Sequence, residues 1–504
     1  MRAHAAALLV LLTVVAGCGD ADLWARWRIE KRMYQVRRLA SHLPSDPTRA
    51  ADADLAGTAA AFTAIREDYP PSRWATPEAL RRPRARDVAT IAGRAAVAAA
   101  RLEEARGRST EALAAYDRAR LEFAGVLPVR LDASLARAEA LERAGNTALA
   151  TDAYAEIVRE FPVVDPETGK PLAAVLDAPI KAARALLERG DQARADAVLG
   201  DAEASLLREI PRHRGSTIAP ELWVRLAGVR AARGRPDQLD PALDALRHAL
   251  AERRVGPRAP EVVLMLAQFS FLGGRADSAL AYAGWAEQMS YEHARPDALL
   301  LEARVYQATA RPDSAIALYG RFIDDYSNLS EPAGIARFSR ARLLEGLGRW
   351  DLARTEYRAL IATDPTHPAS FQARELLVRH YTQLHEKDLA QDEAQRALDE
   401  LERMITTNQD VEVQKQARAT RARLLIATEE YGPACEALTE LWNRYAGDPL
   451  GASAALEAAG IAVERLNDRG RARRLYEEVA QRAVDPRAQQ AARLGLERLD
   501  RRGG

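Results

Sequence analysis

The sequence is poor in cysteine, in aromatic residues and in net charge, and each shortage excludes a class of protein. Its 504 residues include two cysteines and 6% aromatic residues, and 72 basic side chains balance 72 acidic ones. A balanced charge gives no field that draws the whole protein to nucleic acid or to an anionic membrane. The Val, Ile and Phe that strands prefer are scarce, and no convincing run with a period of two appears. We therefore expect an all-α protein that does not bind nucleic acid.

Catalytic and cofactor motifs are also missing. There is no P-loop, no GxGxxG motif after a strand and no HExxH pair among the eight histidines. His380 and His385 are five positions apart, a spacing that does not place two metal ligands on one helix face. We expect no enzyme activity, no cofactor and no metal. A helical toroid or a transglycosylase-like enzyme is the less favoured alternative, because transglycosylases of that sort append a catalytic domain, whereas this chain ends in a repeat helix.

The amino terminus carries the most specific local signal. Arg2 precedes an apolar run over residues 5–14, which is too short to span a bilayer comfortably, and Val15-Ala16-Gly17-Cys18 follows. These four residues resemble the lipobox of bacterial lipoproteins. The resemblance implies a signal peptide over residues 1–17, lipid on Cys18 and a membrane attachment through acyl chains. Cys435 is then the one remaining cysteine, so no intrachain disulfide forms, and its helical context predicts a small buried thiol.

From residue 21 to about residue 499 the pattern is one of amphipathic helices in pairs, with short turns between the two helices of each pair. A small residue follows the turn residue five positions later in all copies except the one at Gly234, and in most copies a bulkier one follows four further on, as in Gly107, Ala112 and Tyr116. The turn residues are Gly107, Gly145, Gly190, Gly234, Gly274, Ala310, Gly348, His385, Glu429 and Asn467. Glycine supplies the turn conformation, and the small residue lets two helices approach closely.

This frame resembles the tetratricopeptide repeat, which has a small residue early in its second helix, an aromatic residue four positions later and often a closing proline. The resemblance covers almost the whole chain after residue 17 and implies a right-handed α-solenoid of about ten or eleven helix pairs. The turn residues are 36 to 45 positions apart, longer than the 34-residue consensus. We therefore expect longer helices or loops than in the consensus.

The repeat around Gly234 departs most from the frame, because Pro236 and Pro241 interrupt it. We interpret residues 211–260 as a degenerate repeat or hinge between an N-terminal array over residues 18–210 and a C-terminal array over residues 261–504. A further insertion at residues 163–177 contains turn residues and is expected to form a protruding loop.

The first helix of the body, over residues 23–43, allows two interpretations. Trp24 and Trp27 lie among Arg and Lys residues, a composition that favours the bilayer interface. Ile29, Met33 and Val36, with Ala40, also form one apolar stripe, which suits a helix that caps a solenoid. We favour the cap.

A repeated arginine occupies the position six residues before several of the turns. The set is Arg101, Arg184, Arg304, Arg342, Arg379 and Arg423. In tetratricopeptide proteins this position usually faces the concave groove in which a peptide or partner helix lies. Arginine binds carboxylates in a two-pronged geometry, so one hypothesis is a groove for an acidic segment or a free C-terminal carboxylate. The alternative is that these arginines are ordinary exposed residues, which Glu345 and Glu375 neutralise.

The combined prediction is a membrane-anchored scaffold that binds one or more proteins of the bacterial cell envelope. By the lipoprotein resemblance it is lipid-anchored, in the outer membrane and facing the periplasm, and by the repeat resemblance it serves outer-membrane or envelope assembly. A secretion or pilus-assembly lipoprotein is the alternative. The identity of the partner does not follow from these residues, because a solenoid leaves specificity to scattered surface side chains.

Overall fold

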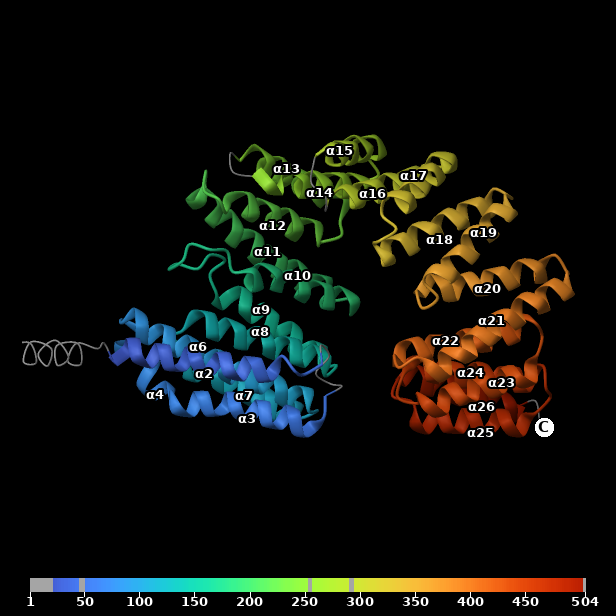
Figure 1. Cartoon of the computed structure of the whole chain (residues 1–504), viewed down its shortest axis with the longest axis horizontal. Helices are drawn as coiled ribbons and strands as arrows, with labels where there is room; N and C mark the ends of the chain where they lie inside the picture. Colours follow the sequence, from blue (N-terminus) through green and yellow to red (C-terminus); the bar gives the residue numbers. More distant parts are fainter. Residues whose placement is uncertain (1–20, 45–49, 253–255, 290–293, 502–504) are drawn as a thin grey trace, which may run out of the picture. The chain divides into compact units, whose positions relative to one another are not determined.

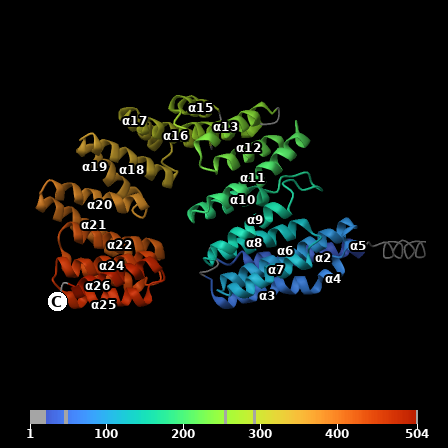
Figure 2. The same cartoon turned by 180° about the vertical axis from the view of Figure 1, so that it is seen from behind.

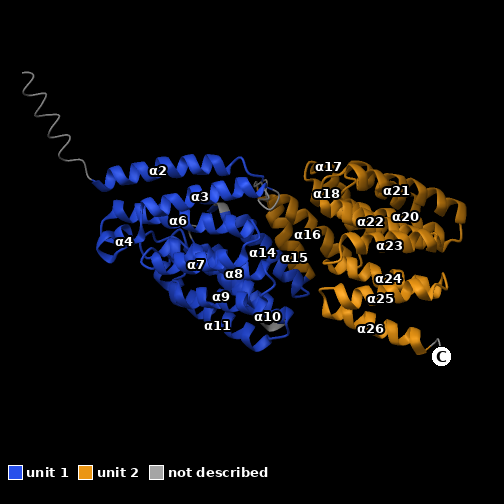
Figure 3. Cartoon of the chain, turned by 90° about the horizontal axis from the view of Figure 1, so that it is seen from below, with its two compact units in different colours: residues 1–275 blue, residues 276–504 orange. Residues whose placement is uncertain are grey.

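The computed structural model describes residues 21–44, 50–252, 256–289 and 294–501, and it is built from helices. The one β-bridge among these residues joins Val164 to Pro171. The chain divides into two compact units, Met1–Arg275 and Ala276–Gly504, which are coloured separately in Figure 3. Within each unit, helices that follow one another in sequence lie side by side, as Figure 1 and the reverse view in Figure 2 show. The predicted all-α fold of stacked helix pairs is confirmed.

Unit 1 begins with two long helices and two short ones and continues with regular pairs. Its α-helices are α2 (Ala21–Ala40), α3 (Asp52–Asp68), α4 (Pro71–Trp74), α5 (Pro77–Leu80), α6 (Pro83–Ala105), α7 (Ser109–Glu122), α8 (Leu127–Arg143), α9 (Thr147–Glu160), α10 (Ala173–Glu188), α11 (Gln192–Glu209), α12 (Ala219–Ala231), α13 (Pro236–Ala251) and α14 (Ala259–Leu272). Two short 3₁₀ segments, η2 (Ile210–His213) and η3 (Gly256–Arg258), precede α12 and α14.

Among its described residues, unit 2 contains a first single helix, five pairs and a last single helix. Its helices are α15 (Ala276–Gln288), α16 (Ala294–Ala308), α17 (Pro312–Asp325), α18 (Ser330–Gly346), α19 (Trp350–Thr363), α20 (Pro368–Gln383), α21 (Lys387–Thr407), α22 (Val411–Ala427), α23 (Tyr431–Arg444), α24 (Pro449–Glu464), α25 (Arg469–Arg482) and α26 (Pro486–Arg501). Among the described residues, α2 with α3, the four pairs from α6 to α13 and the five pairs from α16 to α25 give ten helix pairs, which agrees with the predicted ten or eleven.

Every predicted turn residue has a left-handed backbone. The six glycines have φ between 66° and 79°, and Ala310, His385, Glu429 and Asn467 have φ between 55° and 65°. Most of these turns also close the preceding helix with a backbone bond from the next residue, such as Asn146 N to the Leu141 carbonyl at 2.9 Å. Such a bond satisfies a carbonyl group that would otherwise lack a partner at the helix end. The frame therefore marks the turns correctly, including the four without glycine.

The small and bulky positions of the frame form the core between helices. The alanines five positions after the turns are buried, and so are the tyrosines four positions later in α7, α9, α17 and α19. Tyr116, Tyr154, Tyr319 and Tyr357 are each at most 2% exposed. Because the alanine has almost no side chain, the neighbouring helix approaches closely at that point, and the tyrosine ring fills the space above it.

The long spacings between turns have three visible causes. The 45-residue spacing contains a small hairpin over residues 163–172, in which Asp165 N donates to the Lys170 carbonyl at 2.8 Å and Leu172 N to the Val163 carbonyl at 2.9 Å. Most second helices have 14 residues, but α21 has 21, which accounts for one 44-residue spacing. The other contains α11, with 18 residues, and the connection over residues 210–218, which includes η2. The predicted loop over residues 163–177 thus contains a hairpin whose tip is exposed and whose base, at Val163 and Val164, is buried.

The two regions that depart from the frame still form helices. The repeat around Gly234 is the pair α12 and α13, with Pro236 at the start of α13 and Pro241 inside it. A hinge at residues 211–260 stays a prediction. At the amino terminus α2 packs on α3 and α6 through the expected stripe, in which Ile29, Met33 and Val36 are buried. The expected packing of this stripe on the neighbouring helices is therefore confirmed.

Candidate partner-binding site

The six arginines of the repeated position are all exposed, and each lies on the first helix of its pair. Arg101 and Arg184 lie on α6 and α10 of unit 1, and the other four lie on α16, α18, α20 and α22 of unit 2. A side chain six residues before the turn lies about a turn and a half from the end of its helix. The same position therefore recurs on the same part of successive first helices.

Three of these arginines line one pocket of about 420 Å³, which we call the arginine hollow. It forms where α20 packs against both α18 and α22. Its lining residues are Phe338, Arg342, Gln372, Glu375, Leu376, Arg379, Arg423, Leu424 and Ala427. Arg304 does not line it, and Arg101 and Arg184 belong to the other unit. The structure therefore gathers half of the predicted set in one place.

Carboxylates neutralise two of the three arginines in the hollow. Arg342 Nη1 lies 2.7 Å from Glu345 Oε2, and Arg423 Nη1 lies 2.5 Å from Glu375 Oε1. Among the described residues Arg379 makes no ion pair. Its positive charge, like that of Arg423, acts to lower the pKa of Glu375. Burial raises the pKa of Glu375, and the two guanidinium groups oppose that shift. The lining keeps an excess of positive charge, centred on Arg379.

The hollow combines this charge with an apolar floor. Leu424 is fully buried and Leu376 is 7% exposed, and Phe338 packs its ring 5.9 Å from that of Tyr357. The Gln372 amide adds a neutral hydrogen-bonding group to the lining. A guanidinium group above apolar side chains suits a carboxylate that is attached to an apolar residue, because the charge and the apolar contact are satisfied together.

A tyrosine network holds the glutamate beside Arg342. The Tyr357 hydroxyl donates to Glu345 Oε2 at 2.8 Å, so Glu345 is shared between the tyrosine and the arginine. The same bond, between residues twelve positions apart, recurs three times: from Tyr116 to Glu104, from Tyr154 to Glu142 and from Tyr319 to Gln307. Burial first, and then the neighbouring carboxylate, raise the pKa of Tyr357. This network was not predicted, although the sequence contains its signal, which is a Glu or Gln three residues before the turn and a Tyr nine residues after it.

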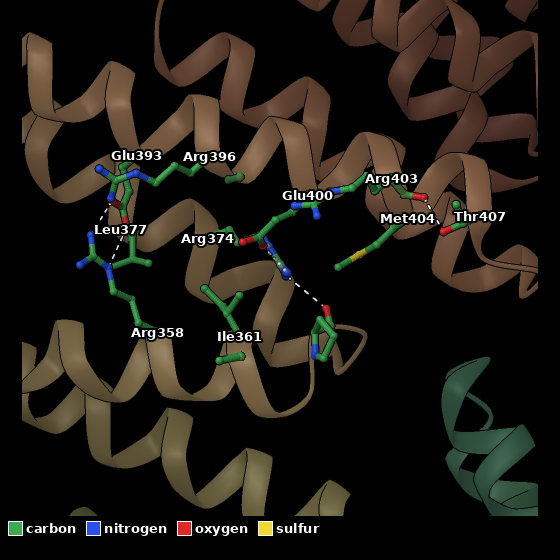
Figure 4. A pocket seen from close by; sticks show the side chains of 13 residues that line it. Arg358, Ile361, Arg374, Leu377, Glu393, Arg396, Glu400, Arg403, Met404 and Thr407 are labelled. Atoms are coloured by element: carbon green, nitrogen blue, oxygen red, sulfur yellow. Dashed lines mark hydrogen bonds and ion pairs between the residues drawn. The ribbon is translucent and has the colours of Figure 1, made fainter.

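A second pocket in unit 2, of about 510 Å³, was not predicted (Figure 4). It lies between α19, α20 and the long helix α21, and Ile361, Leu377 and Met404 are among its apolar lining residues. Arg374 is 2% exposed, and it binds Glu400 at 2.9 Å and donates to the Pro365 carbonyl at 3.2 Å.

Two further arginines of this pocket share a single carboxylate, while Arg403, also in the lining, makes no ion pair with a described residue. Arg358 and Arg396 both lie within ion-pair distance of Glu393, at 2.7 and 3.3 Å (Figure 4). Burial lowers the pKa of Arg374, and Glu400 partly offsets that shift. Since its buried cation is fully engaged, we interpret the pocket as a packing feature that ties the loop before α20 to α21.

The remaining candidate residues fall into three groups. Cys18 lies outside the residues that the structure describes. Cys435 is fully buried, as expected, with its Sγ 3.5 Å from the Ala458 carbonyl, and burial raises the pKa of its thiol. His380 stacks on Trp350 with 3.4 Å between ring centroids. Within the described ranges no group of three or more His, Cys, Asp or Glu residues is placed to hold a metal ion, and no helix is long and apolar enough to cross a membrane.

The family comparison identifies repeats in both units. A family profile described as tetratricopeptide repeat matches residues 97–164, 300–368 and 340–405. No curated protein matches the chain.

Solved structures to which the chain is similar include yeast Tom70, at 12% identity and a TM-score of 0.39 over 96% of this chain and 97% of that one. A tetratricopeptide repeat protein from Parabacteroides merdae is 14% identical, with a TM-score of 0.32 over 55% of this chain and 98% of the other. The pilF protein of Pseudomonas aeruginosa is 19% identical, with a TM-score of 0.30 over 48% and 95%. The matched segments show that the chain contains tetratricopeptide repeats, and the helix pairs outside these segments follow the same frame.

Proposed function

We propose that this protein is a lipid-anchored scaffold of the cell envelope that holds a partner protein by an acidic segment or a free C-terminal carboxylate. Tetratricopeptide repeats form extended surfaces for binding other proteins. The proposal rests on one observation, the meeting of Arg342, Arg379 and Arg423 in one hollow with an excess of positive charge. The lipid anchor and the periplasmic location come from the lipobox-like segment that ends at Cys18.

The pairing inside the hollow suggests how it discriminates between partners. Arg379 is the cation to which an incoming carboxylate binds first, because no described carboxylate pairs with it. Glu375 disfavours anions nearby and competes for Arg423. An acidic partner therefore gains one strong contact at Arg379, and it gains a second if it displaces Glu375 from Arg423.

Charge reversal at Arg379 tests the hollow directly. The probe is a short acidic peptide with an apolar last residue and a free C-terminus, and binding is measured by fluorescence anisotropy at low and moderate salt. We expect Arg379→Glu to weaken binding by about thirtyfold, close to 2 kcal/mol. Arg403→Glu is the matched control, because Arg403 is an exposed arginine of α21 in the same unit that lies outside the hollow. Equal affinity of the two variants would refute the site.

Two further measurements complete the test. Glu375→Gln is expected to strengthen binding, because it removes the negative charge that competes for Arg423. Amidation of the peptide's C-terminus separates a requirement for the terminal carboxylate from a requirement for acidic side chains. Affinity capture from the envelope, with the triple variant Arg304→Glu, Arg342→Glu and Arg379→Glu as the comparison, then identifies the natural partner. A captured pilus or secretion component would favour the alternative pathway over envelope assembly.

A further inference from the structure

The first helix of the described chain has two unlike faces. Its inner face packs on α3 and α6, and Figure 3 shows α2 at the surface of unit 1 with these helices beneath it. Its outer face leaves Trp24 56% exposed, Trp27 52% and Tyr34 69%. Large aromatic side chains are usually buried, and a group of them on the surface marks a site of contact with another protein or a membrane. A cap requires the inner stripe alone, so the outer aromatic residues need a separate explanation.

The basic residues of α2 divide in the same way. Arg26, at the side of the helix, pairs with Glu30 and with Asp87, at 2.9 and 2.7 Å, and Arg32 pairs with Asp68. The outer cations make no ion pair with any described residue; these are Arg28, Lys31 and Arg38.

The outer cations and the outer aromatic residues form one surface. Lys31 Nζ lies 5.2 Å from the centroid of the Trp27 ring, and Arg28 Nε donates to the Trp24 carbonyl at 3.3 Å. The Trp24 and Trp27 rings meet edge to face, with 6.2 Å between their centroids. We call Trp24, Trp27, Arg28, Lys31, Tyr34 and Arg38 the α2 outer face.

We propose that the α2 outer face binds the interface of a bilayer that contains anionic lipids. Tryptophan and tyrosine rings settle at the level of the lipid headgroups, and unpaired cations beside them are attracted to anionic phosphates. From Trp24 to Arg38 the face extends for about 21 Å along the helix. This length is sufficient to lay the helix against the membrane surface.

The proposal rests on the proposed function in one respect, which is the tether. α2 begins at Ala21, three residues after the predicted lipid-bearing Cys18, so an anchored chain brings this face to the membrane. An open hollow of about 760 Å³ beside Trp24 and Trp27 also contains Arg73. The acid in its lining, Asp68, is already paired with Arg32. The hollow therefore adds a further cation to the surface that faces the headgroups.

The test is tryptophan quenching by brominated phosphatidylcholine, with the full-length protein reconstituted in vesicles that also contain phosphatidylglycerol. Trp74 and Trp442 are buried, so the exposed tryptophans dominate the quenched signal. We expect strong quenching that is mostly lost in the double variant Trp24→Phe and Trp27→Phe. Trp285→Phe is the matched control, because Trp285 is 45% exposed but lies on α15, and this variant should keep the quenching. Lys31→Glu combined with Arg38→Glu should remove the dependence on phosphatidylglycerol.

Other outcomes would overturn the inference. Quenching that persists in the double tryptophan variant would place another tryptophan at the membrane. A protein that attaches to vesicles without any quenching would show that the face does not reach the bilayer. If such a protein is also crosslinked to a second copy through α2, the occupant of the face is that copy and not lipid. Mass spectrometry of the amino-terminal peptide reports lipid on Cys18 separately, so a failed tether is distinguished from a failed face.

Discussion

The substitutions Ala310→Gly and Gly348→Ala, at two equivalent turns of unit 2, should change its stability in opposite directions. Ala310, between α16 and α17, has φ of 55°, and Gly348, between α18 and α19, has φ of 71°. A Cβ at Gly348 would meet no atom within 4 Å, so the effect of a substitution there is conformational and not steric. Ala310 keeps a Cβ in a backbone conformation that L-residues resist.

The magnitude follows from two opposing terms. The left-handed conformation costs a residue with a Cβ roughly 1–2 kcal/mol. Glycine in turn loses more conformational freedom on folding, which costs roughly 0.5–1 kcal/mol. Ala310→Gly is therefore expected to stabilise unit 2 by about 1 kcal/mol, and Gly348→Ala to destabilise it by a similar amount. The double variant should return close to the stability of the original protein, because the ion pair that links the two turns, between Arg349 and Asp313, is exposed and couples them only weakly.

The assay is hydrogen exchange of the amides in α16 to α19, followed by mass spectrometry, because repeat arrays often depart from all-or-none unfolding. Denaturant unfolding of the whole chain supports it. Gly460→Ala is the control, because it makes the same chemical change as Gly348→Ala but should stabilise the protein. Gly460 lies inside α24, where an added Cβ would meet no atom within 4 Å and where alanine is favoured over glycine. Faster exchange in Ala310→Gly than in the original protein would refute the conformational argument.

Three further changes test other parts of the packing. Burial, reinforced by a neighbouring carboxylate, raises the pKa of Glu302 to about 6. The folded state then holds this proton more tightly than the unfolded chain, so unit 2 should lose about 1 kcal/mol, after allowance for solvent screening, as pH rises from about 4.5 to 6. Thermal unfolding over a pH series should show no such loss in Glu302→Gln. Tyr357→Phe removes the hydroxyl bond to Glu345 and should cost about 1.5 kcal/mol by denaturant unfolding. Gly451→Ala would push a Cβ into the Tyr445 carbonyl oxygen, which is main chain, and should cost about 3 kcal/mol in the same assay.

The sequence predicts the local geometry of the fold well because that geometry is set over short distances. A turn residue, the small residue five positions later and the bulky residue beyond it all belong to one helix pair. The turns at His385 and Glu429 were predicted without glycine, since the flanking helices require a turn there, and both residues have a left-handed backbone. The exposure of the arginine at the sixth position before a turn follows from the same frame, because helix periodicity fixes which face it occupies.

The set of residues that meet in the arginine hollow was less predictable, because it depends on how separate helix pairs stack. The Arg423 and Glu375 pair joins residues 48 positions apart, and it exists because α20 packs on α22. The frame places each of these residues on a first helix, but it does not give the rotation between neighbouring pairs. The same limit applies to the pocket of Figure 4, where the seven additional residues of α21, relative to α19, bring Arg403 and Met404 beside α19 and α20.

The role of a single arginine in this chain depends on whether a carboxylate pairs with it. Many arginines of unit 2 bind carboxylates of an adjacent repeat, as Arg349 binds Asp313 at 2.9 Å and Arg358 binds Glu393. Exposed pairs of this kind contribute little to stability individually, but they neutralise the surface between repeats. Against that background an exposed cation without a carboxylate stands out, because the chain has as many acids as bases. Arg379 in the hollow and Lys31 on α2 are such cations, and each lies beside exposed or pocket-lining apolar side chains. Positive charge next to apolar surface is the combination that an acidic peptide or an anionic membrane recognises, so these two places are where the neutral scaffold is expected to bind its partners.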